Sequence, residues 1–226
     1  MKHFTIALFA VLLAACNTQP QEPELSENDV VLDRLHRVTN SDADLAYVDP
    51  DADFGRFNRI MVDPLAVDKV EIIEPDMRAS ASVRARGANW ELTDEDKQRL
   101  QEAFADAMRI QLEEKGDYPI VTEAGDDVLR ISAVLTALAP NAPPDDFQSR
   151  SIGRSRVYTE GAGTVFITVG FADSVTGEVL GLVKDSRATP NNWGVNNSVS
   201  NLADVRFIFS SWARGIRARL DLIHGH

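Results

Sequence analysis

The chain has 226 residues, a formal net charge of −12 from 23 Lys and Arg against 35 Asp and Glu, and a single Cys. The length suits one domain of ordinary size or two small ones, and the lone Cys excludes an intramolecular disulfide and any Cys-rich zinc site. The acidic balance disfavours a nucleic acid as partner, because non-specific binding to nucleic acid depends on clustered Lys and Arg.

The start of the chain has the form of a secretion signal. Lys2 supplies a positive charge, and residues 4–13 form an apolar stretch that is broken only by Thr5. Such a stretch is long enough for the core of a signal peptide and too short for a membrane span of about 20 residues. We therefore expect residues 1–15 to be a signal peptide.

The sequence Leu13-Ala14-Ala15-Cys16 resembles the lipobox of bacterial lipoproteins. In that family the Cys thiol receives a diacylglyceryl group and a peptidase cuts before it, which implies lipidation of Cys16 and cleavage between Ala15 and Cys16. Asn17 stands where an Asp would favour the inner membrane, so the resemblance implies a lipid anchor in the outer membrane, with the chain on its periplasmic face. The alternative is a buried free Cys that follows two small residues.

The segment after Cys16 is strongly acidic. In residues 17–54 ten acidic side chains face only Arg34 and Arg37. Charged segments that contain Pro are typical of solvated tethers. We therefore expect residues 16–53 to form a lipidated, acidic tether and residues 54–226 to form a single domain.

The first elements of that domain are a strand and a helix. Residues 57–62 predict a strand, and Pro64 places it at an edge or a strand end; residues 70–73 are strand-like, while the rest of 68–92 follows no clear pattern. Thr93 has the form of a helix N-cap with Asp96 three residues on, and Gly116 is a natural stop. Apolar residues recur at every fourth position of this helix, namely Leu100, Phe104, Met108 and Leu112.

The second half predicts strands followed by a helix. Residues 118–122 predict a short strand, and residues 127–138 alternate between apolar and polar as in a half-buried antiparallel strand. Residues 164–172 and 178–185 predict a hairpin with Gly177 at a positive φ. A last helix is expected over 202–222, and its apolar face contains Leu202, Val205, Phe209, Trp212, Ile216 and Leu220.

This order of elements favours an α+β fold. We expect an antiparallel or mixed sheet of about five strands, with two amphipathic helices packed on one face. The lipobox, the Asp173-to-Glu178 hairpin and the closing Trp212-to-Leu220 helix resemble a family of bacterial lipoproteins of unknown function. At the level of the fold, the domain resembles the periplasmic domain of the curli-secretion lipoprotein and the amino-terminal domain of TolB. That resemblance implies fold and compartment, and it implies no catalytic residue.

Motifs of catalysis and metal binding are missing from the sequence. It has no His-x-x-x-His motif, no Cys pair and no Gly-x-Ser-x-Gly motif, and a terminal His224-Gly-His226 is more simply a frayed polar end than a metal site. The 35 acidic residues guarantee accidental carboxylate pairs. We therefore expect no catalytic residue, no metal and no cofactor, and we expect that the protein is not an enzyme.

Two groups of residues are candidates for contact with a partner. Arg78, Arg84 and Arg86 form one basic cluster, and Arg150, Arg154 and Arg156 form another. Such arginines suit an anionic partner through charge-assisted bonds, or they pair with the domain's own carboxylates. Trp193, which lies among Asn residues, suits either a binding loop or the rim of the core.

The sequence therefore predicts an envelope lipoprotein without enzymatic activity. Its membrane contact would be the lipid anchor, and its domain would bind a protein or assemble with copies of itself. The alternative is a carboxylate-dependent envelope hydrolase that acts on a glycan or a peptide. Only the acidic composition and the compartment favour that alternative.

Overall fold

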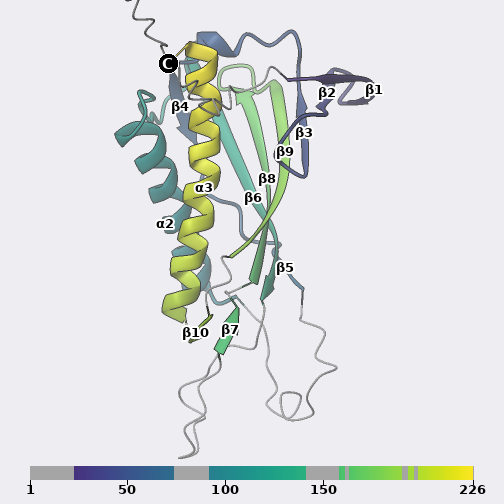
Figure 1. Cartoon of the computed structure of the whole chain (residues 1–226). Coiled ribbons are helices and arrows are strands. Elements are labelled where there is room, and N and C mark those ends of the chain that lie inside the picture. Colours follow the sequence, from purple (N-terminus) through teal and green to yellow (C-terminus); the bar gives the residue numbers. More distant parts are fainter. Residues whose placement is uncertain are drawn as a thin grey trace, which may run out of the picture.

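The computed structural model describes residues 23–73, 92–140, 158–160, 163–189, 193–195 and 198–225. These residues form a large mixed β-sheet with two long helices, as Figure 1 shows. The elements in chain order are β1 (Leu25–Val31), β2 (Leu35–Val38), β3 (Leu45–Val48), the short 3-10 helix η1 (Phe54–Arg56), β4 (Arg59–Val62), β5 (Glu71–Ile72), α2 (Asp94–Met108), the π-helical turn η2 (Arg109–Glu114), β6 (Val128–Pro140), β7 (Tyr158–Glu160), β8 (Gly163–Asp173), β9 (Val179–Ala188), β10 (Trp193–Val195) and α3 (Ser198–His224).

The main sheet contains eight strands in the order β1-β2-β3-β9-β8-β6-β4, and β5 also pairs with β6. Most neighbours are antiparallel, whereas β4 and β5 run parallel to β6. A separate two-stranded sheet joins β7 and β10. The fold is therefore α+β with a mixed sheet, and the expected number of about five strands is too low.

The extra strands come from the acidic segment that the sequence analysis assigned to a tether. Strands β1, β2 and β3 lie within residues 25–48, and β3 pairs with β9. The sheet therefore begins well before residue 54, where we expected the domain to start. Antiparallel pairing uses backbone N–H and C=O groups, so a charged strand can join a sheet edge when few of its side chains need burial. In this region Leu35 and Ala46 are buried.

The centre of the sheet is built from the long strands β6, β8 and β9. Side chains alternate across β6, so that Leu129, Ile131, Ala133 and Leu135 are almost fully buried while Arg130, Val134 and Thr136 are exposed on the opposite face. This is the two-residue period of a sheet with one covered face. The predicted apolar alternation over residues 127–138 is thus confirmed.

The hairpin between β8 and β9 also forms as predicted. Gly177 has a φ of 72°, a left-handed conformation that Gly adopts without strain. Strand β4 lies at the end of the ladder order, in agreement with the edge position that Pro64 indicates. The expected strand over 118–122 is reduced to one isolated bridge between Ile60 and Ile120.

Helix α2 begins where the sequence predicts. The Thr93 hydroxyl accepts a hydrogen bond from the Asp96 backbone N–H at 3.1 Å, and an Asp96 carboxylate oxygen accepts one from the Thr93 N–H at 3.1 Å. This reciprocal capping box satisfies two backbone donors that would otherwise lack partners. The helix ends in the π-helical turn η2, just before Gly116, where a Cβ would lie only 2.7 Å from the Leu112 carbonyl oxygen. Gly is therefore required there by a close approach of the backbone.

Helices α2 and α3 cover the same face of the sheet (Figure 1). Phe104 of α2 meets Phe209 of α3 edge to face, with ring centroids 5.6 Å apart. Near their carboxyl ends the Arg217 guanidinium donates to the Lys115 carbonyl at 2.9 Å. Residue numbers therefore rise together along the two helices, so α2 and α3 run in the same direction.

Candidate functional site

The residues that the sequence singled out for function lie mostly outside the described part of the chain. Ala15 and Cys16 do so, and so do both basic clusters, that is Arg78, Arg84 and Arg86 together with Arg150, Arg154 and Arg156. Trp193 belongs to β10, where it stands opposite Glu160 of β7. The lipid anchor and the contact role of these residues therefore stay predictions.

One polar cluster forms at the turn between β8 and β9. A carboxylate oxygen of Asp173 accepts hydrogen bonds from the backbone N–H groups of Val175 and Thr176, each at 2.8 Å, and Arg56 pairs with the same carboxylate. The backbone hydrogen bond from Thr176 has the largest effect on Asp173. Together with the one from Val175 it outweighs burial and holds the pKa of Asp173 below its ordinary value. The cluster therefore contains a carboxylate whose charged form is favoured by the hydrogen bonds that shape the turn.

A second cluster attaches α3 to β9. The Trp212 indole N–H donates to the Asp185 carboxylate at 2.6 Å, and Arg187 Nε donates to the same carboxylate oxygen at 3.0 Å. Arg187 also donates to the Ser211 hydroxyl and lies over the Trp212 ring. Asp185 is only 7% exposed, and a carboxylate that is buried in this way needs partners within the fold, which Arg187 and Trp212 supply. This cluster secures the helix to the sheet.

A third cluster joins the carboxyl end of α3 to the segment after η2. The Tyr118 hydroxyl donates to an Asp221 carboxylate oxygen at 3.0 Å, and burial followed by this charged acceptor raises the pKa of Tyr118. His224 donates from Nε2 to the Phe57 carbonyl at 3.0 Å, and its ring packs against Tyr118. The expectation that His224 belongs to a frayed end is therefore wrong.

None of these arrangements resembles an acid–base pair poised for catalysis. Hydrogen bonds from Arg59 lower the pKa of Asp127. At Asp63, burial raises the pKa, but the hydrogen bonds from Ser132 and Arg130 outweigh burial, so the pKa is lowered there as well. A carboxyl that serves as a general acid needs a raised pKa instead. Within the described ranges, no group of three or more His, Cys, Asp and Glu side chains is placed to hold a metal ion.

The outer face of α3 carries the one aromatic side chain among the large exposed hydrophobic residues of the described chain. Phe207 is 56% exposed, and the exposed side chains of Arg206 and Arg214 lie close by along the helix. Among the described residues, neither arginine has a hydrogen-bond or ion-pair partner. Aromatic and Arg side chains are both enriched at surfaces where proteins make contact.

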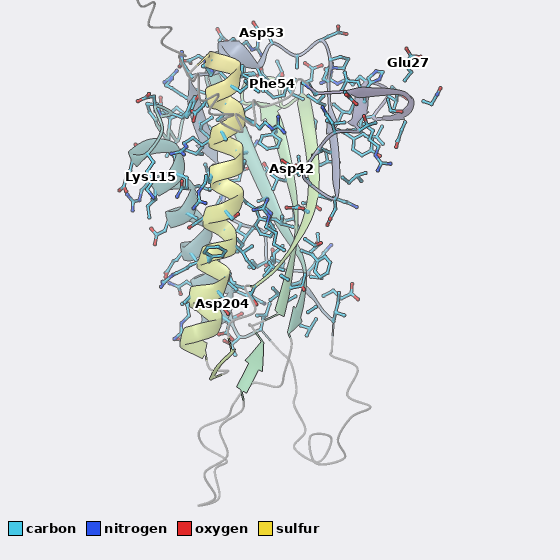
Figure 2. The ribbon with its side chains drawn as sticks, in the orientation of Figure 1. Glu27, Asp42, Asp53, Phe54, Lys115 and Asp204 are labelled. Atoms are coloured by element: carbon cyan, nitrogen blue, oxygen red, sulfur yellow. The ribbon has the colours of Figure 1, made fainter. Side chains whose placement is uncertain are left out.

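The outer face of α2 and η2 has the opposite character. Glu95, Glu102, Asp106 and Glu113 are all exposed there. Glu95 pairs with Arg99, whereas Glu102 accepts a hydrogen bond at 2.8 Å from the neutral amide of Gln98. Lys115 lies just beyond this acidic stretch, on the outside of the helix layer (Figure 2). We refer to Arg206, Phe207 and Arg214 as the basic face and to Glu102, Asp106 and Glu113 as the acidic face.

Sequence reasoning missed the basic face, although a sign of it is present. The predicted apolar stripe of the last helix runs through Phe209 and Trp212, and both are buried. Phe207 does not belong to that stripe, so helical periodicity alone marks it as pointing away from the core.

No helix in the described part of the chain is both long enough and apolar enough to span a membrane.

Solved structures that are similar to this chain include a PelC dodecamer from Paraburkholderia phytofirmans, with 11% identity, a TM-score of 0.36, and coverage of 72% of this chain and 89% of that one. A DUF330 protein from Xanthomonas campestris has 11% identity and a TM-score of 0.41, with coverage of 74% and 85%. A putative neuraminyllactose-binding hemagglutinin homolog from Helicobacter pylori has 10% identity and a TM-score of 0.35, with coverage of 74% and 85%.

No curated protein matches the chain. The model of one protein family, however, matches residues 25–216, which include every strand of the main sheet and most of α3. The chain therefore belongs to the family of proteins of unknown function named DUF3313.

Proposed function

We propose that this protein is a non-enzymatic lipoprotein of the cell envelope, whose domain binds a protein partner or a further copy of itself. Its anchor would be a lipid on Cys16 in the outer membrane, with the domain on the periplasmic side. The observation that carries the proposal is the basic face of α3, where exposed Phe207 lies beside two arginines that have no partner among the described residues. The lipobox supports the anchor.

A protein contact explains this face better than solubility does. Aromatic and Arg side chains are enriched where proteins meet, because each combines a large contact area with directed polar interactions. The remaining arginines near the core are already committed to contacts within the fold, as Arg56 is to Asp173 and Arg187 is to Asp185. Arg206 and Arg214 are thus the arginines of α3 that are available to a partner.

The hydrolase alternative gains no comparable support. It requires a carboxyl with a raised pKa beside a second carboxylate. The carboxyls of Asp63, Asp127 and Asp173 instead have lowered pKa values and hydrogen-bond to side chains or backbone groups of the fold. We therefore propose binding rather than catalysis.

The anchor is tested by labelling cells with palmitate. The unaltered chain should incorporate the label, and Cys16→Ala should abolish incorporation because the acceptor thiol is gone. Ala15→Gly serves as the matched control, since it keeps a small residue before Cys16 and should retain the label. Label that persists in Cys16→Ala would show that the lipobox assignment is wrong.

The binding function is tested by in-cell cross-linking of the full-length chain followed by mass spectrometry. We expect a discrete cross-linked species. Its yield should fall at least about tenfold in Phe207→Ala, because aromatic side chains at the centre of an interface supply much of the binding energy. Val175→Ala is the matched control, because Val175 is 57% exposed but lies on the β8–β9 turn, away from α3. A chain that cross-links to nothing, or equally well in both variants, would contradict the proposal.

A further inference from the structure

We propose that the partner is a second copy of this chain, and that the basic face of one copy packs against the acidic face of the other. The two copies would be related by a two-fold axis that runs parallel to α2 and α3. This inference rests on the proposed function, because it names the partner that the exposed face of α3 would bind.

The two helices carry opposite net charges. From Asp94 to Glu114, seven carboxylates oppose three basic side chains, so this segment is net acidic. From Ser198 to His224, four arginines oppose two aspartates, so α3 is net basic. Complementary charge on two faces of one molecule favours association between copies and sets their register.

Both faces also keep charge that the described fold does not neutralise. Arg206 and Arg214 have no partner among the described residues. On the other helix, Glu102 is exposed and its carboxylate accepts from a neutral amide, whereas Asp106 reaches Arg109 only at 3.9 Å. Each face therefore has charge left for an intermolecular partner.

The charged residues of the two faces also lie at matching heights along the helices. Phe104 lies level with Phe209, and Lys115 lies level with Arg217, because these pairs are in contact and the helices run in the same direction. Counting along the helices from these two contacts puts Arg206 at the height of Glu102. The same count puts Arg214 between the heights of Asp106 and Glu113.

A two-fold rotation about an axis parallel to the helices leaves every height unchanged. It places α3 of one copy over α2 of the other, and α2 of the first over α3 of the second. Arg206 then faces Glu102 of the second copy, and Arg214 faces its Asp106 and Glu113. In such an isologous interface each of these contacts occurs twice.

The basic face also has the shape that close helix packing needs. Ala203, Ser210 and Ala218 lie along the same side of α3 as Phe207 and Arg214, at helical spacings of three and four residues. Small residues around one protruding aromatic let a second helix approach and receive the Phe207 ring. The apolar contact supplies affinity, and the charges fix the partner helix.

Charge exchange tests the pairing directly. In the full-length chain in detergent, Arg206→Glu with Arg214→Glu places acidic side chains on both faces, whereas Glu102→Arg with Glu113→Arg places basic side chains on both faces. Sedimentation velocity should show that the unaltered chain associates with itself. The association constant of each double variant should be at least about 30-fold lower, because like charges then face each other in both contacts.

The two double variants should associate when they are mixed, and the chain with all four substitutions should associate with itself. Both association constants should lie within about threefold of that of the unaltered chain. Circular dichroism shows whether each variant folds. An unaltered chain that stays monomeric at every concentration, or a mixture that fails to associate, overturns the inference.

The outcome also separates this inference from the proposed function. If cross-linking captures a different envelope protein and never a second copy, the inference is overturned while the binding function stands. If the chain associates with nothing at all, both are overturned. Association of a second copy that no charge exchange alters would overturn the pairing of the two faces.

Discussion

Helices α2 and α3 share one buried layer and differ in almost everything else. Both bury aromatic and aliphatic side chains on the same face of the sheet, where Phe104 meets Phe209. Outside this layer α2 is acidic and begins with a capping box, whereas α3 is basic and is tied to the sheet by buried polar contacts such as Trp212 to Asp185. The shared face therefore serves folding, and the contrasting faces are available for recognition.

The strongest test removes what the two helices share. Phe104→Ala deletes an aromatic ring that both helices use, so we expect a loss of about 3–5 kcal/mol in the free energy of unfolding. Urea denaturation monitored by circular dichroism measures it. Phe207→Ala is the matched control on the exposed side and should cost less than about 1 kcal/mol. Equal losses for the two variants would contradict the division between buried and exposed faces.

The next test concerns the polar attachment of α3 alone. Asp185→Ala leaves the Trp212 indole N–H and the Arg187 guanidinium without their buried acceptor, so we expect a loss of about 1–3 kcal/mol. Near-ultraviolet circular dichroism should show a changed environment of Trp212. If stability and the Trp212 signal both stay unchanged, the cluster does not attach the helix to the sheet.

A pH titration sharpens the same contrast at the other end of α3. The raised pKa of Tyr118 means that the unfolded chain loses this proton at lower pH than the folded chain does. The stabilisation is therefore complete below about pH 10, the ordinary tyrosine pKa, and declines as the pH rises above it. At neutral pH the free energy of unfolding of Tyr118→Phe should be about 1–2 kcal/mol lower than that of the unaltered chain. When the pH is raised from 9 to 11, this variant should lose less of its free energy of unfolding than the unaltered chain does. Identical alkaline slopes would contradict the assignment.

The start of α2 offers a smaller effect. Thr93→Ala removes the side-chain acceptor for the Asp96 N–H, which should cost about 1 kcal/mol. Thr93→Ser retains the hydroxyl and should lie within about 0.5 kcal/mol of the unaltered chain. Thermal denaturation of the two variants side by side provides the comparison, and equal melting temperatures would mean that the cap is not needed.

The smallest expected effect concerns the exposed charges. Arg214→Gln and Glu102→Gln should each change the free energy of unfolding by less than about 0.5 kcal/mol, because neither side chain is buried. Both should nevertheless weaken self-association in sedimentation experiments. A large loss of stability in either variant would assign that charge to folding instead of recognition.

The sequence predicts the parts of the fold whose patterns arise from burial. The fourth-position repeat from Leu100 to Leu112 and the alternation around Ile131 are direct results of one covered face, and both were correctly predicted. Gly177 was equally informative, since the β8–β9 turn needs a left-handed residue. In each case a local pattern records a requirement of the folded state.

Strands β1 to β3 were missed for a physical reason. They lie at one side of the sheet, and the side chains of β1 are largely exposed, so acidic residues such as Glu27 and Asp29 are tolerated. Backbone pairing with a neighbouring strand leaves little periodic signature when few of the side chains are buried. Figure 2 shows Glu27 at the far end of this hairpin, away from the helix layer.

The candidate site was only partly predictable as well. Sequence reasoning expected a binding protein but placed the contact at arginine clusters that lie outside the described residues. Arg206 and Arg214 are more than 90 residues from the acidic face along the chain, so their relation to Glu102 and Asp106 depends on the packing of Phe104 against Phe209. Such a relation exists only in three dimensions.

The shared direction of α2 and α3 has one more consequence. Each helix carries a macrodipole equivalent to about half a positive charge at its amino end and half a negative charge at its carboxyl end. Antiparallel neighbours cancel these fields, whereas two helices that point the same way add them. Asp94 to Asp96 offset the amino end of α2, and the Arg217 guanidinium donates to the Lys115 carbonyl at the carboxyl end of η2. The helix layer is thus electrically polar along its length, and charged side chains of the opposite sign meet both ends of the segment formed by α2 and η2.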